Sequence, residues 1–336
     1  MIRSALWVWI FFCLSLPLPA EARMTFALPV LCAMGERCVI QNYLDRDPGP
    51  EYRDYQCGSL SYDGHQGTDF RVKTVQVMRD GVAVVAAARG KVKAIRDGVE
   101  DGDPSGHLNL EKIGDRPAGN GVLLDHGNGW ETQYSHLRRG SVQVVPGQEV
   151  EAGEKLGLIG QSGMAAFPHL HFEVRLHGTP VDPFAFTRQP LCGADNDPLW
   201  SASAKKSLDY RPSGELSSGF AHQVPDDAFV AHPPLQPDSG WSTAPALLFW
   251  VNLFGVRNHD RETIRLLDPS GKILAEQSRT HSKHRARSMS YIGKKAPSAD
   301  HHWPAGRYSG EYTLFRDGTD QPILQINKQL MIPDDR

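Results

Sequence analysis

Residues 169–176 read HLHFEVRL, and this stretch decides the fold because polar and apolar side chains alternate along it. Such alternation predicts a β-strand, in which every second side chain points to the same face. His169 and His171 would then share one face, about 6.6 Å apart along the strand, while Leu170 and Phe172 point into the core. One of the two histidines could bind a metal while the other reaches a substrate or a metal-bound water.

A second histidine lies in residues 64–70, which read GHQGTDF. On an extended strand His65 and Asp69 would be about 13 Å apart, which is too far to share an ion whose ligand bonds are about 2.1 Å long. They can share an ion only if the chain bends between them. Gly64 and Gly67 supply the conformational freedom for this bend, and a strand is expected to begin at Asp69.

The third histidine segment lies in a predicted hairpin. Residues 120–126 and 130–137 read as strands joined by Gly127-Asn128-Gly129, a strong hairpin signal. By the two-residue repeat, His136 is expected to share a strand face with Tyr134. With two further strands expected within 81–95, the first domain, residues 61–186, is predicted to be mostly antiparallel β-sheet.

Ligands of type His, Asp and His together with one water make an open tetrahedral zinc site. Zinc lowers the pKa of bound water to near 7 and polarises a carbonyl, which suits attack on an amide. A further pair of imidazoles can move protons and stabilise an oxyanion. Softer metals are disfavoured because no cysteine accompanies the histidines, so one Zn²⁺ per chain is expected.

At these residues the chain closely resembles the lysostaphin and LytM type of zinc metallopeptidases. The resemblance covers residues 60–186 and rests on the motifs His65-x-x-x-Asp69 and His169-x-His171 and on four longer segments, VLLDHGNGWETQYSHL (122–137), GQEVEAGEKLGLIGQSG (147–163), PHLHFEVRLHG (168–178) and PVDPFAF (180–186).

The resemblance implies a fold, a site and a substrate. The fold would be an antiparallel β-sheet core with a groove. The zinc ligands would be His65, Asp69 and His171, and the catalytic pair beside the metal would be His136 and His169. The substrate would be the stem peptides or cross-bridges of peptidoglycan.

The sequence departs from the family pattern before the His169 motif, where it reads Ala165-Ala166-Phe167-Pro168. Phe167 is expected to narrow or reshape the groove, so cleavage of glycine bridges is not implied. Tyr134 and Phe167 are candidate groove or substrate contacts. Residues 97–119 form a loop that looks longer than usual, which is either functional or a plain surface excursion.

The N-terminus predicts export. Residues 1–22 combine Arg3, an apolar run from 5 to 16 and Ala20-Glu21-Ala22, which is typical of a signal peptide. The mature protein is therefore expected in the periplasm, in the cell wall or outside the cell, with no membrane span after cleavage.

Four cysteines remain after cleavage of the signal peptide, Cys32, Cys38, Cys57 and Cys192, which predicts two disulfides with three possible pairings. A bridge to Cys192 would tie the N-terminal segment, residues 23–60, to the end of the first domain. This segment is expected to pack on the catalytic domain and to restrain the groove. Asn42 is a candidate inhibitory contact, because its amide oxygen could replace water on the zinc.

Beyond residue 186 the sequence pattern changes. Residues 187–207 are expected to be a linker, and residues 208–333 a small Ig-like β-sandwich with strands at 246–254, 262–267, 272–277, 308–315 and 322–331. A basic cluster, Lys283, His284, Arg285 and Arg287, reads as a solvated loop or as a contact to an anionic wall polymer.

The 336 residues carry a net charge of −3, which argues against a nucleic-acid-binding protein, because such proteins are usually strongly basic. The expected function is a secreted zinc endopeptidase that hydrolyses peptidoglycan peptides. The alternatives are a non-catalytic wall-binding activator of another hydrolase, a zinc peptidase acting on proteins, and a structural wall-binding protein that works through residues 208–333. The oligomeric state is not predicted.

Overall fold

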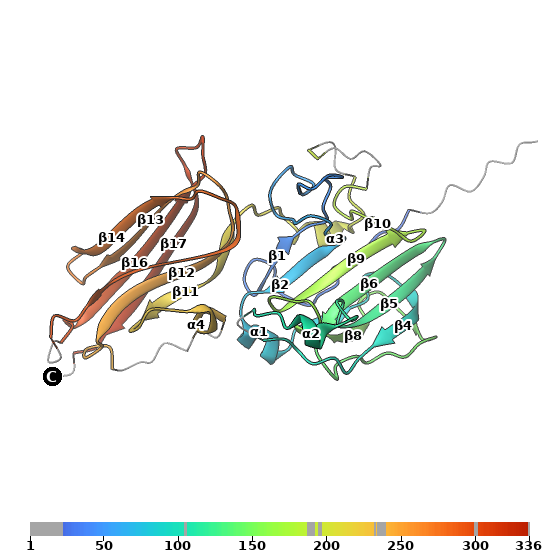
Figure 1. The fold of residues 1–336 in the computed structure, drawn as a ribbon, viewed down its shortest axis with the longest axis horizontal. Helices are drawn as coiled ribbons and strands as arrows, with labels where there is room; N and C mark the ends of the chain where they lie inside the picture. The colour runs from blue at the N-terminus through green and yellow to red at the C-terminus, as the bar shows by residue number, and fades with distance from the viewer. Residues whose placement is uncertain are drawn as a thin grey trace, which may run out of the picture.

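The computed structural model describes residues 23–103, 106–186, 192–193, 197–231, 233, 240–298 and 302–334. Figure 1 shows two β-rich domains side by side, one drawn in blue to green and the other in yellow to red. All pairs between named strands are antiparallel within the described residues, so the prediction of a mainly antiparallel β fold is confirmed. The predicted signal peptide lies outside the described residues.

One eight-stranded sheet forms the body of the first domain, and its order is β1-β2-β9-β6-β5-β4-β7, with β10 beside β9. These strands are β1 (Cys38–Asn42), β2 (Thr68–Val72), β4 (Gly90–Arg96), β5 (Asn120–Gly127), β6 (Trp130–Leu137), β7 (Glu149–Val150), β9 (His169–Leu176) and β10 (Thr179–Val181). A second, two-stranded sheet pairs β3 (Ala83–Val85) with β8 (Lys155–Leu158). The β5–β6 hairpin confirms the turn predicted at residues 127–129.

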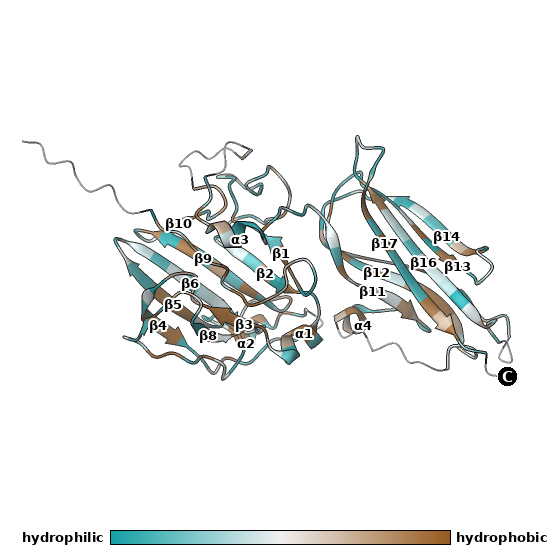
Figure 2. Ribbon diagram, turned by 180° about the vertical axis from the view of Figure 1, so that it is seen from behind, coloured by the Kyte–Doolittle hydropathy of each residue, from teal (hydrophilic) through white to brown (hydrophobic). Residues whose placement is uncertain are grey.

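Apolar side chains on one face of the large sheet build the first core. Leu170 and Phe172 of β9 are both fully buried, as the alternation of HLHFEVRL predicts. Figure 2 shows the same alternation of apolar and polar residues along several strands. The helices among the described residues are short: α1 (Val75–Asp80), α2 (Leu110–Ile113), α3 (Ala202–Lys205) and α4 (Asp227–Ala231). The long loop 97–119 carries α2.

The segments that flank the family-like region are packed onto it. The N-terminal segment contributes β1 to the large sheet, and disulfides join Cys32 to Cys38 and Cys57 to Cys192. The described part of the expected linker is not extended, because Leu199 and Trp200 are buried in the first core. The chain therefore leaves the first domain only after these residues.

The second domain is a sandwich of a three-stranded and a four-stranded sheet, with orders β11-β12-β15 and β14-β13-β16-β17. Its strands are β11 (Gly214–Ala221), β12 (Ala246–Val256), β13 (Arg261–Leu267), β14 (Ile273–Thr280), β15 (Arg285–Lys295), β16 (Gly306–Phe315) and β17 (Pro322–Ile332). The prediction missed β11 and β15. Arg285 and Arg287, expected in a solvated loop, are strand residues of β15.

Between the sheets of the second domain lies a buried polar network centred on Glu262. Its carboxylate accepts hydrogen bonds from the Tyr312 hydroxyl at 2.8 Å and the Ser290 hydroxyl at 2.8 Å, and it pairs with His281 Nε2 at 3.0 Å. Burial alone would raise the pKa of Glu262, but the hydrogen bonds from these three partners outweigh burial and lower it. The network is thus a stable ionised centre within the sandwich.

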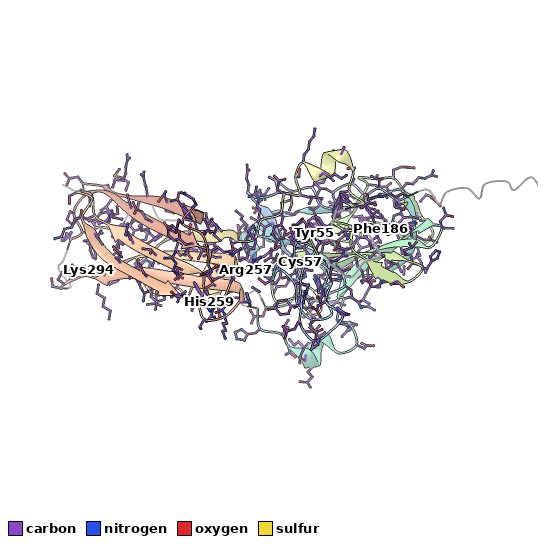
Figure 3. All side chains as sticks on the ribbon, turned by 90° about the horizontal axis from the view of Figure 1, so that it is seen from above. Tyr55, Cys57, Phe186, Arg257, His259 and Lys294 are labelled. Carbon is purple, nitrogen blue, oxygen red and sulfur yellow. A yellow bond between two sulfur atoms is a disulfide. The ribbon has the colours of Figure 1, made fainter. Side chains whose placement is uncertain are left out.

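The two domains share apolar and polar contacts. Leu216 and Phe254 of the second domain belong to the hydrophobic core of the first. The Tyr210 hydroxyl donates to buried Asp54 at 2.8 Å. Figure 3 shows Cys57 and Arg257 near the junction, where both line one hollow. Among the described residues, no helix has the length and apolar character needed to cross a membrane.

Candidate metal centre and groove

Three side chains from different segments converge at one point of the large sheet. His65 Nε2 lies 3.2 Å from Asp69 Oδ1 and 3.2 Å from His171 Nδ1, and His171 Nδ1 lies 3.1 Å from the same carboxylate oxygen. His65 and Asp69 are buried, and His171 is partly buried. This is the His, Asp and His set that the sequence predicted, and these atoms are close enough together to hold one metal ion.

The backbone explains how the three residues meet. Asp69 and His171 are direct partners in the antiparallel pair β2–β9, so their side chains rise from the same face. His65 precedes β2 and is turned back toward Asp69, and Gly64 has a φ of 75° at this bend. A Cβ on Gly67 would lie 2.8 Å from the His171 ring, so only glycine fits there. The predicted bend between His65 and Asp69 is confirmed.

Outer contacts fix the orientation of each of these three side chains. His65 Nδ1 lies 2.7 Å from the Tyr43 carbonyl oxygen, so Nδ1 carries the proton and the Nε2 lone pair faces the site. His171 is turned the other way, with Nδ1 facing the site and Nε2 3.9 Å from the Glu173 carboxylate. Tyr43 follows directly after β1, so the N-terminal segment takes part in building the site.

Asn42, the last residue of β1, lies opposite Asp69 in the β1–β2 pair. Its Nδ2 donates to Asp69 Oδ2 at 2.8 Å, on the oxygen that does not face the two histidines. In this arrangement Asn42 orients the carboxylate. The sequence prediction gave Asn42 a different contact, in which its amide oxygen covers the metal, and that inhibitory role stays a prediction.

His136 enters the site through an irregularity of β6. It is the extra residue in a β-bulge, because its neighbours Ser135 and Leu137 pair with Gly121 and Asn120, which are adjacent in β5. Its φ is 62°, a left-handed value that is unfavourable for a residue with a Cβ and is found at functional sites. The bulge turns His136 toward His169, with ring centroids 4.6 Å apart.

This bulge overturns one expectation about β6. Tyr134 and His136 do not share a face, because the extra residue reverses the alternation between them. Tyr134 is fully buried, and its hydroxyl accepts a hydrogen bond from the Ala87 amide at 2.8 Å. Tyr134 therefore presents no surface to a substrate in this structure.

His136 and His169 are held in the same tautomer. His136 Nδ1 lies 2.8 Å from the Ser162 carbonyl oxygen, and His169 Nδ1 lies 2.8 Å from the Phe167 carbonyl oxygen. Both Nδ1 atoms therefore donate, and each Nε2 keeps its lone pair. His169 Nε2 is 3.5 Å from Asp69 Oδ1, so it lies next to the converging ligand atoms.

The electrostatics separate these histidines into two kinds. Burial, reinforced by the charges of His169 and His171, lowers the pKa of His136 well below its usual value. Burial likewise lowers the pKa of His169. For His171, burial would lower the pKa, but hydrogen bonds with Asp69 and Glu173 outweigh it and raise the pKa to about 9. His136 and His169 are thus neutral proton acceptors at neutral pH.

The balance between burial and nearby charges at Asp69 tests whether a metal fits the site. Burial would raise the pKa of Asp69, but the charges of His65 and His169 and the hydrogen bonds from His171 and His65 hold it well below its usual range. A buried carboxylate therefore stays ionised while the histidine beside it attracts a proton. The set favours positive charge at its centre, and a divalent cation supplies that charge to the same lone pairs.

Two aromatic side chains flank the centre. The Phe167 ring lies 4.6 Å from the His169 ring and is partly exposed, as a groove contact requires. Tyr62, which the sequence reasoning missed, stacks on His65 with centroids 4.4 Å apart and is 50% exposed. No motif points to Tyr62, and only its position three residues before His65 hints at it.

The long loop 97–119 borders a hollow of about 880 Å³ beside Gly163. The loop also supports the segment that orients His136. The backbone N–H of Gln161 donates to the Asp101 carboxylate at 2.7 Å, and the carbonyl oxygen of the next residue, Ser162, is the acceptor for His136. The loop is therefore connected to the site and is not a free surface excursion.

Comparison with known proteins finds similarity within the first domain. Residues 63–183 match Peptidase family M23. The peptidoglycan DD-endopeptidase ShyA of Vibrio cholerae is 43% identical over 65 residues, which are 19% of this chain and 15% of that protein. The DD-carboxypeptidase/endopeptidase Mpg of Neisseria meningitidis is 43% identical over 65 residues, 19% of this chain and 14% of that protein.

A solved structure of a zinc-containing peptidase from Vibrio cholerae is 26% identical to this chain, covers 42% of it and 38% of the other chain, and has a TM-score of 0.28. The chain spans only 15% and 14% of the length of the two curated relatives.

Proposed function

We propose that this chain is an exported zinc endopeptidase that hydrolyses peptide bonds in the stem peptides or cross-links of peptidoglycan, because residues 63–183 match Peptidase family M23. One observation carries the proposal: His65, Asp69 and His171 converge within 3.2 Å of one another, with two neutral imidazoles beside them. This arrangement supports an open zinc site with proton-transfer groups in reach.

In this mechanism His65, Asp69 and His171 would hold the metal through the ligand atoms that converge. Zinc, when bound, supplies Lewis acidity and lowers the pKa of water to near 7. The Nε2 atoms of His136 and His169 accept a proton from the attacking water and return it to the leaving amine. Once protonated, either imidazolium stabilises the negative charge that develops on the carbonyl oxygen. Because burial lowers the pKa of both residues, their imidazoles are unprotonated at neutral pH and their Nε2 lone pairs are available.

The names of the matched relatives support the substrate class. ShyA is a peptidoglycan DD-endopeptidase, and Mpg is a DD-carboxypeptidase/endopeptidase. The family match covers residues 63–183, which include His65, Asp69, His136, His169 and His171, and this favours similar bond cleavage here. The domain division that goes with this proposal is a signal peptide (1–22), an N-terminal segment (23–60), a peptidase domain (61–186), a connection (187–207) and an accessory sandwich (208–333).

The proposal is tested with the purified full chain and isolated sacculi. Soluble muropeptides should be released, a chelator should abolish release, and added zinc should restore it, with mass spectrometry identifying the cleaved bond. Full activity in metal-free protein would refute the zinc site. Cleavage of a protein substrate without release of muropeptides would favour a protein-directed peptidase. Stimulation of another hydrolase without intrinsic release would favour a non-catalytic activator.

A further inference from the structure

A buried arginine next to the catalytic centre lacks the partner that such a residue normally has. Arg71 lies on β2 directly opposite His169 of β9, and it is 6% exposed. It donates to the Gln41 side chain, but no carboxylate among the described residues pairs with it, and its Nε is buried without a hydrogen bond. Buried charges are normally paired, because an unpaired one costs several kcal/mol of desolvation energy.

Phe167 connects this arginine to the catalytic centre. The Arg71 guanidinium lies over the Phe167 ring, with Cζ 4.4 Å from the ring centroid. The other neighbour of this ring is His169, at 4.6 Å. Arg71 and His169 are also cross-strand neighbours. A group bound at Arg71 would therefore lie within about one or two residues of a peptide bond held at the metal.

The second domain closes the space around Arg71. A cavity of about 20 Å³ is lined from the first domain by Arg71, Lys73 and Phe167, and from the second domain by Asn252 and Arg287. Its lining contains three cationic side chains and no acidic one. Arg287 itself donates to Asp227 of α4. The cavity has room for about one or two water-sized groups, which suits a small anionic group and not a whole peptide.

Other features of the cavity agree with an anionic ligand. The Arg71 guanidinium is charged at neutral pH, as arginine side chains are in proteins. Asn252 is 2% exposed, and its Oδ1 has no hydrogen-bond partner. That oxygen can accept the N–H of the residue that carries the anion. The guanidinium donors match the oxygens of a free carboxylate, and the Asn252 oxygen matches a single N–H group beside it.

We propose that Arg71, Arg287 and Asn252 form a pocket for a free carboxylate of the substrate, close to the bond that is cleaved. This inference rests on the proposed peptidase function and deepens it. It gives the accessory domain a definite role, because β12 and β15 supply two of the three proposed residues, Asn252 and Arg287. The enzyme should accordingly select peptides that carry a free carboxylate near the scissile bond.

The test compares two synthetic cross-linked stem peptides that differ only in whether the carboxylate nearest the scissile bond is free or amidated. The wild-type chain should cleave the free acid with a kcat/KM about 10- to 100-fold higher, the range of a lost charge-assisted hydrogen bond. The difference should lie mainly in KM, because the contact exists before and during the reaction.

Variants assign the preference to residues. Arg287→Gln should reduce the preference for the free acid, and Arg71→Gln should abolish it, with melting temperatures confirming that both variants fold. Arg285→Gln, two residues away on β15, exposed and outside the cavity lining, is the matched control and should retain the full preference.

Equal cleavage of both peptides by the wild-type chain would overturn the carboxylate pocket while leaving the peptidase function intact. An unchanged preference in folded Arg71→Gln would do the same. Failure of the wild-type chain to cleave either peptide or to digest sacculi would instead count against the proposed function itself.

Discussion

Replacing Asn42 with alanine removes the hydrogen bond, 2.8 Å long, that holds Asp69 Oδ2. Both residues are buried, at 6% and 2% exposure, so water does not readily replace the lost donor. A hydrogen bond to a charged group contributes about 1.5–3 kcal/mol, and loss of such an outer contact weakens metal binding by about 10- to 100-fold. Since a tenfold change corresponds to about 1.4 kcal/mol, the two estimates agree.

The assay is competition for zinc between the protein and a chelating dye, together with turnover at saturating zinc. Asn42→Ala should bind zinc about 10- to 100-fold more weakly and should recover much of its turnover when zinc is in excess. Asn327→Ala, an exposed asparagine on β17, is the control and should match the wild type. Turnover above the wild-type value with unchanged zinc affinity would refute this reasoning and support an inhibitory Asn42.

Three further outcomes follow. His171→Ala should lose zinc and thermal stability, whereas His169→Ala should keep both and lower turnover by about 10²–10⁴-fold. Equilibrium dialysis measures the zinc and kinetics the turnover. The opposite pattern would reverse the ligand assignment. Hydrogen bonds lower the pKa of Glu262 despite its burial. The ionised Glu262 therefore stabilises the fold above the unfolded pKa, and this contribution is lost as pH falls through the folded pKa. Glu262→Gln should be less stable than the wild type at pH 7, and its melting temperature should change less with pH below about pH 4.5. Replacing Cys57 and Cys192 with serine should lower the unfolding free energy by about 5 kcal/mol, against about 2 for the shorter loop of the other disulfide; equal losses in denaturant titrations would contradict the loop-entropy reasoning.

The strands that sequence predicted are those whose apolar residues alternate. The β9 stretch HLHFEVRL has its leucine and phenylalanine buried and its histidines in the site. The missed strand β15 has the opposite character, since its buried positions include Ser288 and Ser290. Ser290 donates to Glu262 in the polar network, and with serines at its buried positions β15 shows no alternation of hydrophobic residues that sequence could reveal.

The pairing of His65 with Asp69 was accessible to sequence reasoning because its constraint is local, whereas the choice of His171 over His169 as the third ligand came from the family resemblance. The spacing of His65 and Asp69 requires a bend, and glycines mark it. The position of His136 was not accessible in the same way, because its entry depends on a bulge against β5 and on a positive φ. A one-residue insertion relative to a partner strand leaves no pattern in the sequence of the strand itself. Simple alternation therefore placed His136 on the wrong face of β6, together with Tyr134.

Residues outside the matched region 63–183 orient two of the candidate metal ligands. The Tyr43 carbonyl sets the tautomer of His65, and Asn42 holds the free oxygen of Asp69. Both belong to the segment that β1 anchors to the sheet. Without it, His65 would lose the acceptor that keeps its proton on Nδ1, and either ring nitrogen could then carry that proton. The N-terminal segment is therefore part of the metal centre, and a chain cut back to the matched region would lack two of the contacts that orient its ligands.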